Sequence, residues 1–482
     1  MMAEKIFGRE EEISRLKACA NSNEAELVIV YGRRRVGKTF LVRQSFGNQF
    51  DFNFVGAYNK PTKTQLDNFA IALNDYSGVS RPIPKNWSEA FRQLREHLEQ
   101  IQKQTKQIVF FDEMPWMDTG RSGFLSAFEY FWNSWGSAQD NLMFVVCGSA
   151  TTWITSKLLN NKGGLYHRAT ERIYLHPFTL EETEKYLISK KVRWNRYDIT
   201  ECYMTMGGIP FYLKQIDPNF TYTQNIDRLF FAPKAILRDE FHSLYRTLFS
   251  NAEAYEQIVM ALGTKKIGLT RSEIIKSTGL ADNGKLTTML NDLASSDFIR
   301  LYNYFGNKKR DVVYQLADYY TLFYLHFLKD KHGIDQHFWT KSIDNPARRA
   351  WAGYAFEQVC KDHLQQVKRA IGISSVLSES SSWFGKNEDD AWAQIDLVID
   401  RRDRVINLCE IKFSQTPFVI DKEYDLKLRN KMAIFQAATK TRKSLNLTMI
   451  TTYGVKQNMH SSLAQSQVTL DDLFESSLKN NP

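Results

Sequence analysis

The first half of the chain alternates short apolar runs with stretches whose apolar residues recur at helical spacing. Residues 27–31, 108–111 and 142–147 are apolar at successive positions, as is typical of parallel strands buried on both faces. Residues 50–54 alternate like a strand, and helical spacing extends over 64–75 and 87–103. The pattern predicts an α/β fold with a doubly wound parallel sheet over residues 1–175, whose ligands bind at the carboxyl ends of the strands.

A helical lid is expected over 176–240, and the following segment, 241–330, has a different pattern. It contains three helical stretches and then two strand-like pieces, at 252–262, 270–275, 283–295, 298–302 and 312–316. Three helices followed by a β-hairpin predict a winged helix, whose third helix would enter a DNA groove. Lys308, Lys309 and Arg310 would lie at the wing tip, where they suit phosphate. A rigid lid or a protein contact is the alternative that stays open.

Residues 345–455 predict a further α/β domain. A helix over 349–370 precedes two apolar strands, 394–399 and 405–412, which a tight charged turn joins. A helix over 421–441 and a strand over 447–450 complete the domain. We expect residues 456–482 to form a polar tail.

The composition narrows the class of protein. A length of 482 residues exceeds what one hydrophobic core usually organises, so roughly two to four domains are expected. The formal charge of +9 favours an anionic partner, with nucleic acid, here DNA, as the commonest candidate. Five scattered cysteines without C-x-x-C spacing argue against a disulfide framework and a zinc site. No apolar run suits a membrane helix and the start lacks a signal-peptide profile, so we expect a cytoplasmic protein without a membrane partner.

The run 27–31 leads into Gly32-Arg33-Arg34-Arg35-Val36-Gly37-Lys38-Thr39, which fits the P-loop pattern GxxxxGK[ST]. The glycine-framed loop cradles phosphate oxygens with its amides, Lys38 reaches the β- and γ-phosphates, and the Thr39 hydroxyl ligates Mg²⁺. Phe40 belongs to the following helix, whose N-terminus favours the anion. ATP and Mg²⁺ are therefore the predicted cofactors. Since the contacts run through amides, we expect Arg33, Arg34 and Arg35 to face outward.

The run 108–111 ends in Asp112-Glu113, the pattern of a Walker B segment. Asp112 can hold Mg²⁺ through its water shell, and Glu113 can polarise the attacking water. The alternative is two surface acids that cap the helix starting near Phe124. Ser149 follows strand 142–147 and is placed to contact the γ-phosphate or the water, or to cap the segment that starts at Thr151.

The order of these motifs resembles the prokaryotic AAA-type ATPases of the archaeal-ATPase group, which are related to STAND and Orc/Cdc6-like P-loop NTPases. The resemblance covers the first half of the chain and implies an AAA/ASCE-type core with a helical lid. The segments that carry it are Phe7-Gly8-Arg9-Glu10, GRRRVGKT, FFDE, CGSA, the Gly-Gly-x-x-x-Arg segment at 163–168, HPF and Gly207-Gly208-Ile209-Pro210.

The resemblance implies roles for further residues. Gly8 and Arg9 would lie in the loop near the base and ribose, and Pro210 would pack on adenine from the lid. Arg168 would sense phosphate, with Arg172 as the less favoured choice, and a solvated surface charge is the alternative for each. Because Arg168 can act within its own chain or on a neighbouring copy, a homo-oligomer stays open.

The C-terminal domain carries a second set of candidate residues. Glu410 and Lys412 point to one face of a strand, and hairpin pairing can bring Asp396 alongside. Two carboxylates can ligate Mg²⁺, and the lysine can position a water or stabilise developing charge. An ordinary surface pair in a hairpin is the alternative.

This D…ExK arrangement resembles the PD-(D/E)xK nuclease superfamily, whose domain accompanies such ATPases in the same group, and Glu357 matches the helical acid of many members. One departure is Ile395, which stands where the motif has proline. The following helix is basic, as a phosphodiester backbone requires, unless its face is merely solvated. Its cations are Lys422, Lys427, Arg429, Lys431, Lys440, Arg442 and Lys443.

These features predict an ATPase whose nucleotide state controls a DNA-directed, Mg²⁺-dependent nuclease-like domain. A regulatory or scaffold NTPase with an inactive nuclease-like domain that only binds DNA or protein is the second hypothesis. A transcription factor that reads DNA through the winged helix is the third.

Overall fold

The computed structural model describes residues 6–101, 103, 105–160, 163–249, 251–306, 312–329, 335–386 and 390–476. The chain divides into two compact units between Pro177 and Phe178. The first unit ends two residues past the expected core boundary at 175. The second gathers the segments expected as lid, winged helix and C-terminal domain.

Five parallel strands form the sheet of the first unit, in the order β2-β3-β4-β1-β5. Their bounds are β1 Glu26–Tyr31, β2 Phe52–Val55, β3 Gln107–Asp112, β4 Leu142–Gly148 and β5 Glu171–Tyr174. Strand β4 pairs with both β1 and β3, so the carboxyl ends of these three strands lie side by side. The predicted parallel α/β sheet is confirmed.

Helices pack on this sheet through a core rich in aromatic side chains. Phe111 of β3 stacks on Phe91 of α4 with ring centroids 5.9 Å apart, and Trp87 meets Phe124 of α5 edge to face at 4.8 Å. Such buried rings fix the strands firmly, because each removes a large apolar area from water. The helices are α1 Glu10–Ala20, α2 Lys38–Ser45, α3 Thr62–Ser77, α4 Trp87–Gln100, α5 Phe124–Ser134 and α6 Thr151–Trp153.

The second unit begins with helices and continues as the expected helix–hairpin segment. Helices α12 (Ala252–Gly263), α13 (Arg271–Thr278) and α14 (Gly284–Ser295) precede the antiparallel pair β7 (Ile299–Tyr302) and β8 (Val313–Leu316). The short strand β6 (Leu269–Thr270), between α12 and α13, completes a sheet in the order β6-β8-β7. Thr270 caps α13 and forms a capping box with Glu273, which explains the sharp helix start. Lys308, Lys309 and Arg310, expected at the wing tip, lie outside the described residues.

The helices and strands of this segment have the following bounds: α7 Leu180–Ser189, α8 Arg196–Met206, α9 Pro210–Leu213, α10 Tyr222–Ile226, α11 Glu240–Leu248, α12 Ala252–Gly263, β6 Leu269–Thr270, α13 Arg271–Thr278, α14 Gly284–Ser295, β7 Ile299–Tyr302, β8 Val313–Leu316, α15 Tyr319–Phe327 and α16 Phe338–Lys341. Most of them are short, and aromatic side chains fill the space between several of them. Tyr320 of α15, for example, lies 5.3 Å from Tyr212 and 6.1 Å from Phe230 between ring centroids.

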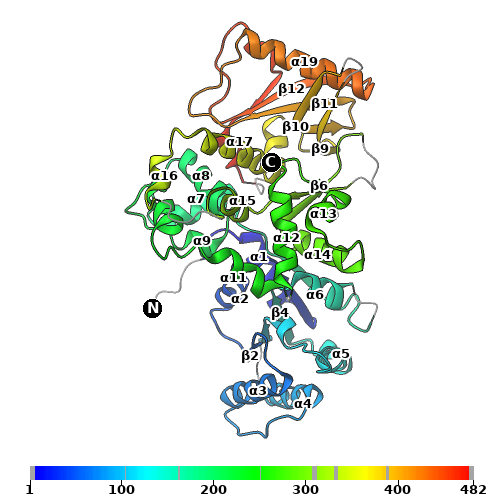
Figure 1. Cartoon of the computed structure of the whole chain (residues 1–482). Helices are drawn as coiled ribbons and strands as arrows, with labels where there is room; N and C mark the ends of the chain where they lie inside the picture. The colour runs from blue at the N-terminus through cyan, green and yellow to red at the C-terminus, as the bar shows by residue number, and fades with distance from the viewer. Residues whose placement is uncertain are drawn as a thin grey trace. The chain divides into compact units, whose positions relative to one another are not determined.

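A second five-stranded sheet, in the order β13-β12-β11-β10-β9, forms the C-terminal part of this unit (Figure 1). Strands β9, β10 and β11 are antiparallel neighbours, whereas β11, β12 and β13 run parallel. Helix α17 packs beside β11 and α19 beside β9 and β10. The bounds are α17 Pro346–Asp362, α18 Leu364–Ala370, β9 Ser378–Lys386, β10 Trp392–Arg401, β11 Val405–Lys412, α19 Lys422–Thr439, β12 Ser444–Thr451, β13 Ser466–Val468 and α20 Leu470–Leu473.

The prediction of a polar tail over 456–482 is wrong for the part that the structure describes, which ends at residue 476. Strand β13 pairs with β12 in register Thr448↔Ser466, and Leu470 and Leu473 of α20 are buried. Polar residues hide this segment in the sequence because only one side of each short element is apolar. The C-terminal domain therefore extends through at least residue 474.

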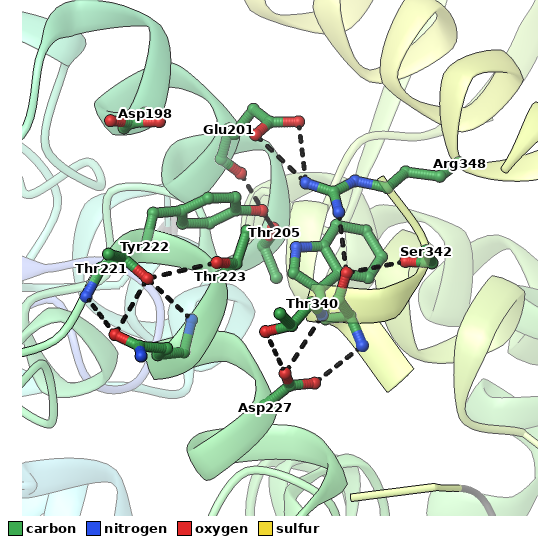
Figure 2. A network of polar contacts seen from close by, with 12 residues as sticks. Asp198, Glu201, Thr205, Thr221, Tyr222, Thr223, Asp227, Thr340, Ser342 and Arg348 are labelled. Atoms are coloured by element: carbon green, nitrogen blue, oxygen red, sulfur yellow. Dashed lines mark hydrogen bonds and ion pairs between the residues drawn. The ribbon is translucent and has the colours of Figure 1, made fainter. Parts of the chain in front are cut away.

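Helix α17 connects the helices at the start of this unit to the C-terminal sheet. Arg348, which is 5% exposed, donates to the Glu201 carboxylate at 3.3 Å and to the Trp339 carbonyl at 2.9 Å (Figure 2). Asp227 holds α16, the short helix that contains Trp339, by accepting hydrogen bonds from the amides of Trp339 and Thr340 at 2.7 and 3.1 Å. A buried guanidinium and a buried carboxylate each lose their hydration, so each depends on the other. The ion pair thus fixes α17 to α8.

The same helix also holds the small sheet. The Tyr354 hydroxyl donates to the Lys266 carbonyl at 3.1 Å, and the Arg300 guanidinium of β7 donates to the Gln358 side-chain oxygen at 2.8 Å. Just past the helix, His363 accepts from the Leu180 amide at 3.0 Å through Nε2, while its Nδ1 lies 2.8 Å from the Val359 carbonyl. This arrangement requires a neutral ring with its proton on Nδ1. Burial lowers the pKa of His363.

We expect His363 to make the second unit less stable in mild acid. Because its folded pKa lies below the unfolded value of about 6.5, its contribution is fully present above that value and is lost as the pH falls. The melting temperature should therefore drop between about pH 7.5 and 5.5 more in the wild type than in His363→Gln, whose amide offers the same acceptor and donor without titrating. Thermal unfolding followed by fluorescence measures this, and parallel curves for the two proteins would contradict it.

Candidate functional site

The P-loop occupies the turn between β1 and α2. Gly32, Arg35 and Gly37 have φ values of 146°, 73° and 93°, which only glycine adopts easily. At Gly32 a Cβ would come within 2.4 Å of the carbonyl oxygen of Leu175, so the close approach of the backbone just past β5 also requires glycine there. The loop can thus turn its amides toward an anion, with the N-terminus of α2 beside them.

Lys38 is the first residue of α2 and is only 6% exposed. Its Nζ donates to the carbonyl oxygens of Gly32 and Arg33 at 3.0 and 2.8 Å. The ammonium therefore lies over the loop that would cradle the phosphates.

Thr39 and Asp112 meet at the carboxyl end of the sheet. The Thr39 hydroxyl donates to the Asp112 carboxylate at 2.8 Å, and Asp112 is 5% exposed. Burial raises the pKa of Asp112, against the lowering effect of the Thr39 hydrogen bond. A hydroxyl and a buried carboxylate side by side fit a Mg²⁺ ion, which is a hard cation that prefers oxygen ligands.

Glu113 follows directly and has a left-handed backbone, with φ 49°. Its carboxylate accepts from both the amide and the hydroxyl of Ser149, at 3.0 and 2.9 Å. Of the two roles considered for Ser149, helix capping does not apply, because Ala150 is the N-cap residue of α6 and makes no side-chain cap. Ser149 instead orients the glutamate that would polarise water.

The remaining P-loop residues correct one expectation. Arg34 and Arg35 are partly exposed, whereas the Arg33 side chain is only 2% exposed. The prediction that Arg33 faces outward is therefore wrong. At 2% exposure the guanidinium of Arg33 is buried together with its stem, while the backbone of the residue still belongs to the loop. Val36 is buried and Phe40 is 37% exposed.

The residues implied by the family resemblance are spread over both units. In the first unit, Gly8 and Arg9 precede α1, and the Arg9 guanidinium donates to the His176 carbonyl. Arg168 is exposed and Arg172 is half-buried. Pro210 opens α9 in the second unit, where the backbone of Gly208 lies so close to Phe178 that a Cβ would approach its carbonyl oxygen to 1.9 Å.

The second candidate cluster is centred on Glu410, which is 3% exposed. Its carboxylate binds Lys412 Nζ at 2.9 Å and Lys431 Nζ at 2.7 Å, and accepts from the Tyr424 hydroxyl at 2.6 Å. Burial would raise the pKa of Glu410, but the charges of Lys412 and Lys431 lower it to about 2. The Glu410 side chain is therefore an anion that forms ion pairs with the ammonium groups of two lysines.

Asp396 lies beside this group on β10. Its carboxylate accepts from the Ile411 amide and from the Gln394 side chain, both at 3.4 Å. Burial and the charge of Glu410 raise the pKa of Asp396. The structure thus brings together the D…ExK residues that the sequence singled out. Among the described residues, no group of three or more His, Cys, Asp or Glu side chains could hold a metal ion.

Glu357 and Lys361 lie one turn apart on α17. Burial and the charge of Asp396 raise the pKa of Glu357 to about 7. Burial and the charge of Arg300 lower the pKa of Lys361 to about 8. Sequence reasoning missed Lys361, although its i, i+4 spacing from Glu357 was a usable signal.

The cations of α19 have different surroundings. Lys431 points inward to Glu410, a role the sequence did not suggest. Arg429 pairs with Asp425 at 3.0 Å. Lys443, which lies beyond the end of α19 and just before β12, donates to the Arg401 carbonyl at 2.9 Å. The basic pattern alone would suggest that the helix presents all its positive charges to a ligand. The structure shows instead that some of them are used in contacts within the domain.

The first half of the chain matches a described protein family. Residues 6–216 match the model of an ATPase domain that is found predominantly in Archaea. An uncharacterized protein of Methanocaldococcus jannaschii, MJECL04, is 22% identical over 445 residues, which cover 91% of this chain and 92% of that protein. An uncharacterized ATP-binding protein of the same organism, MJ0423, is 49% identical over 44 residues, or 9% of this chain and 75% of that protein.

Two solved structures are also similar to the chain. The Walker-type ATPase PABY2304 of Pyrococcus abyssi is 18% identical with a TM-score of 0.46, covering 66% of this chain and 96% of that one. The Orc2 protein of Aeropyrum pernix, in its ADPNP and ADP complexes, is 12% identical with a TM-score of 0.40, covering 75% of this chain and 96% of that one. Across the described ranges, no helix combines the length and the apolar character that crossing a bilayer requires.

Proposed function

We propose, on the premise that residues 6–216 are an ATPase domain of the type found predominantly in Archaea, that this chain binds and hydrolyses MgATP and thereby controls a DNA-directed C-terminal domain. The observation that carries the first part is the hydrogen bond from Thr39 of α2 to Asp112 at the end of β3, with Glu113 following directly and Lys38 over the loop. Bound Mg²⁺ would supply charge neutralisation at the β- and γ-phosphates.

Each residue has a distinct task in this proposal. The loop amides and Lys38 bind the phosphates, and Thr39 and Asp112 hold the metal and its water shell. Glu113 orients and polarises the attacking water, and Ser149 keeps its carboxylate in place. Arg168, whose side chain is exposed, is the candidate to sense the γ-phosphate from its own chain or from a second copy.

Replacing Lys38 tests nucleotide binding directly. Lys38→Ala removes a charge-assisted contact to phosphate, and we expect MgATP affinity to fall by about 10- to 100-fold. Titration calorimetry with MgATP measures the effect. The matched control is Lys17→Ala, which removes an exposed lysine of α1 and should leave affinity unchanged. Equal affinities for both variants would remove the P-loop from the proposal.

For the C-terminal domain we propose Mg²⁺-dependent cleavage of DNA. Asp396 and Glu410 would hold the ion, and Lys412 would position the water or stabilise the developing charge on phosphorus. Glu357, whose pKa is raised to about 7, is poised near neutrality to exchange a proton. The close grouping of Asp396, Glu410 and Lys412 supports this proposal.

A second function is favoured by one specific contact. Lys431 binds the Glu410 oxygen that Lys412 does not use, at 2.7 Å, so two ammonium groups already neutralise this carboxylate. A domain that retains DNA without cutting it would have this arrangement. The deciding measurement is nicking and cleavage of linear and branched DNA with added Mg²⁺ or Mn²⁺, next to DNA retention at several salt concentrations.

A further inference from the structure

An exposed pair of aromatic rings lies on the C-terminal sheet, close to Asp396. Trp392 of β10 is 65% exposed and Phe384 of β9 is 40% exposed. Their rings are nearly parallel, with 8° between the planes and 6.3 Å between the centroids. A tryptophan that offers two thirds of its surface to solvent is unusual on a folded sheet, because this residue normally buries a large apolar area.

The strand register shows which face of the sheet carries these rings. Strand β10 pairs with β9 as Trp392↔Lys386 and Gln394↔Phe384. The intervening Ala393 and Ile395 belong to the core that packs against α19. Because side chains alternate along a strand, Trp392, Phe384 and their neighbours point to the face opposite α19. This face is therefore free of the helix that covers the other one.

The aromatic pair has a cation beside it and lies near Asp396 along β10, whereas the Glu410 carboxylate points to the face that α19 covers. Lys386 Nζ lies 5.9 Å from the centre of the Trp392 ring, and it forms an ion pair with Asp390, whose side chain is 75% exposed. Such a surface pair is weak, so Lys386 can exchange it for phosphate. Gln394, which is opposite Phe384 in the strand register, donates to the Asp396 carboxylate at 3.4 Å.

We propose that Trp392 and Phe384 form a stacking platform for the unpaired bases of single-stranded DNA, with Lys386 beside it on the phosphate backbone. Aromatic faces stack on any base, and interleaved cations follow the backbone, which is how single strands are bound without sequence preference. Paired bases inside a duplex do not expose their faces, so the platform selects unpaired DNA. The inference rests on the proposed DNA-directed function and names its substrate class.

The test measures binding by the full chain in EDTA, where no cleavage occurs. The probe is a fluorescein-labelled oligothymidylate of about 20 nucleotides, a length that spans typical single-strand sites, and its binding is followed by anisotropy. Trp392→Ala should weaken binding by about 5- to 100-fold, whereas Trp392→Phe, which keeps a ring, should weaken it far less. Tyr130→Ala, which removes a 74% exposed ring of α5, is the matched control and should have no effect.

Two further measurements separate stacking from charge. A strand of equal length with abasic positions keeps its phosphates, and we expect it to bind the wild type as weakly as oligothymidylate binds Trp392→Ala. In a plot of the logarithm of the binding constant against the logarithm of the salt concentration, Lys386→Gln should make the slope less steep by about 0.7. This is the value for one phosphate contact on a single strand. Equal affinity of the wild type and Trp392→Ala for oligothymidylate, or stronger binding of duplex than of single strand, would overturn the platform and leave the DNA-directed function standing. If the wild type binds neither DNA, the proposed function itself fails.

Discussion

Glu113→Gln should reduce ATP turnover by about 100- to 10,000-fold while MgATP still binds. The amide keeps the size of the carboxylate and can still accept a hydrogen bond from Ser149, whose amide and hydroxyl lie 3.0 and 2.9 Å from Glu113. It cannot, however, take up the proton of the attacking water. The loss should therefore appear in kcat, with affinity close to that of the wild type. Phosphate release and MgATP titration together measure this.

Ser149→Ala provides the matched comparison. It removes the hydroxyl contact but keeps the amide that also binds Glu113, so kcat should fall much less than in Glu113→Gln. Normal turnover in Glu113→Gln would show that another group polarises the water. A joint loss of turnover and of MgATP binding would instead indicate that Glu113 supports the fold of the site.

Asp396→Asn and Lys412→Met should each lower Mg²⁺-dependent DNA cleavage by about 100-fold or more, since the first removes a ligand of the ion and the second removes the charge that would stabilise the reacting phosphate. Both replacements nearly keep the volume of the side chain, so the sheet should fold. DNA retention should fall by less than tenfold, because other cations remain. Cleavage of a labelled strand in single-turnover conditions measures the first effect, and anisotropy measures the second.

Lys17→Met, at an exposed position of α1, is the control for the loss of a positive charge. If the wild type cuts no DNA with Mg²⁺ or Mn²⁺ but retains it in a salt-sensitive manner, the domain is the binding module that the Lys431–Glu410 contact favours. If Lys412→Met cuts at the wild-type rate, the lysine does not act in cleavage.

The first sheet was predictable because its strands are apolar on both faces, as Leu142–Gly148 illustrates. Strand β9 escaped prediction since it lies at the sheet edge and begins Ser-Glu-Ser-Ser-Ser, which has no apolar alternation. The tail assignment failed for a related reason: a three-residue strand contributes only Val468 to the core. Edge strands and short elements thus contain too few apolar residues in a regular pattern to be predicted from the sequence.

The candidate site shows the same limit. Spacing alone singled out Asp396, Glu410 and Lys412, because the hairpin that joins them is local. Lys431 lies 21 residues beyond Glu410, and only the packing of α19 on the sheet brings the two together. The sequence shows that Lys431 is positively charged, but it does not show that the side chain points toward Glu410.

The Arg348–Glu201 pair also limits how this chain can be divided. A cut at residue 345, where the sequence suggests a domain boundary, would remove Arg348 and leave a buried carboxylate on α8 without its counter-charge, a change that costs about 3–5 kcal/mol in comparable proteins. The C-terminal domain therefore cannot be exchanged for another domain at this boundary without destabilising the helices before it. A chimera that gave these helices a new C-terminal domain would have to bring along α17, or replace Glu201 by an uncharged side chain.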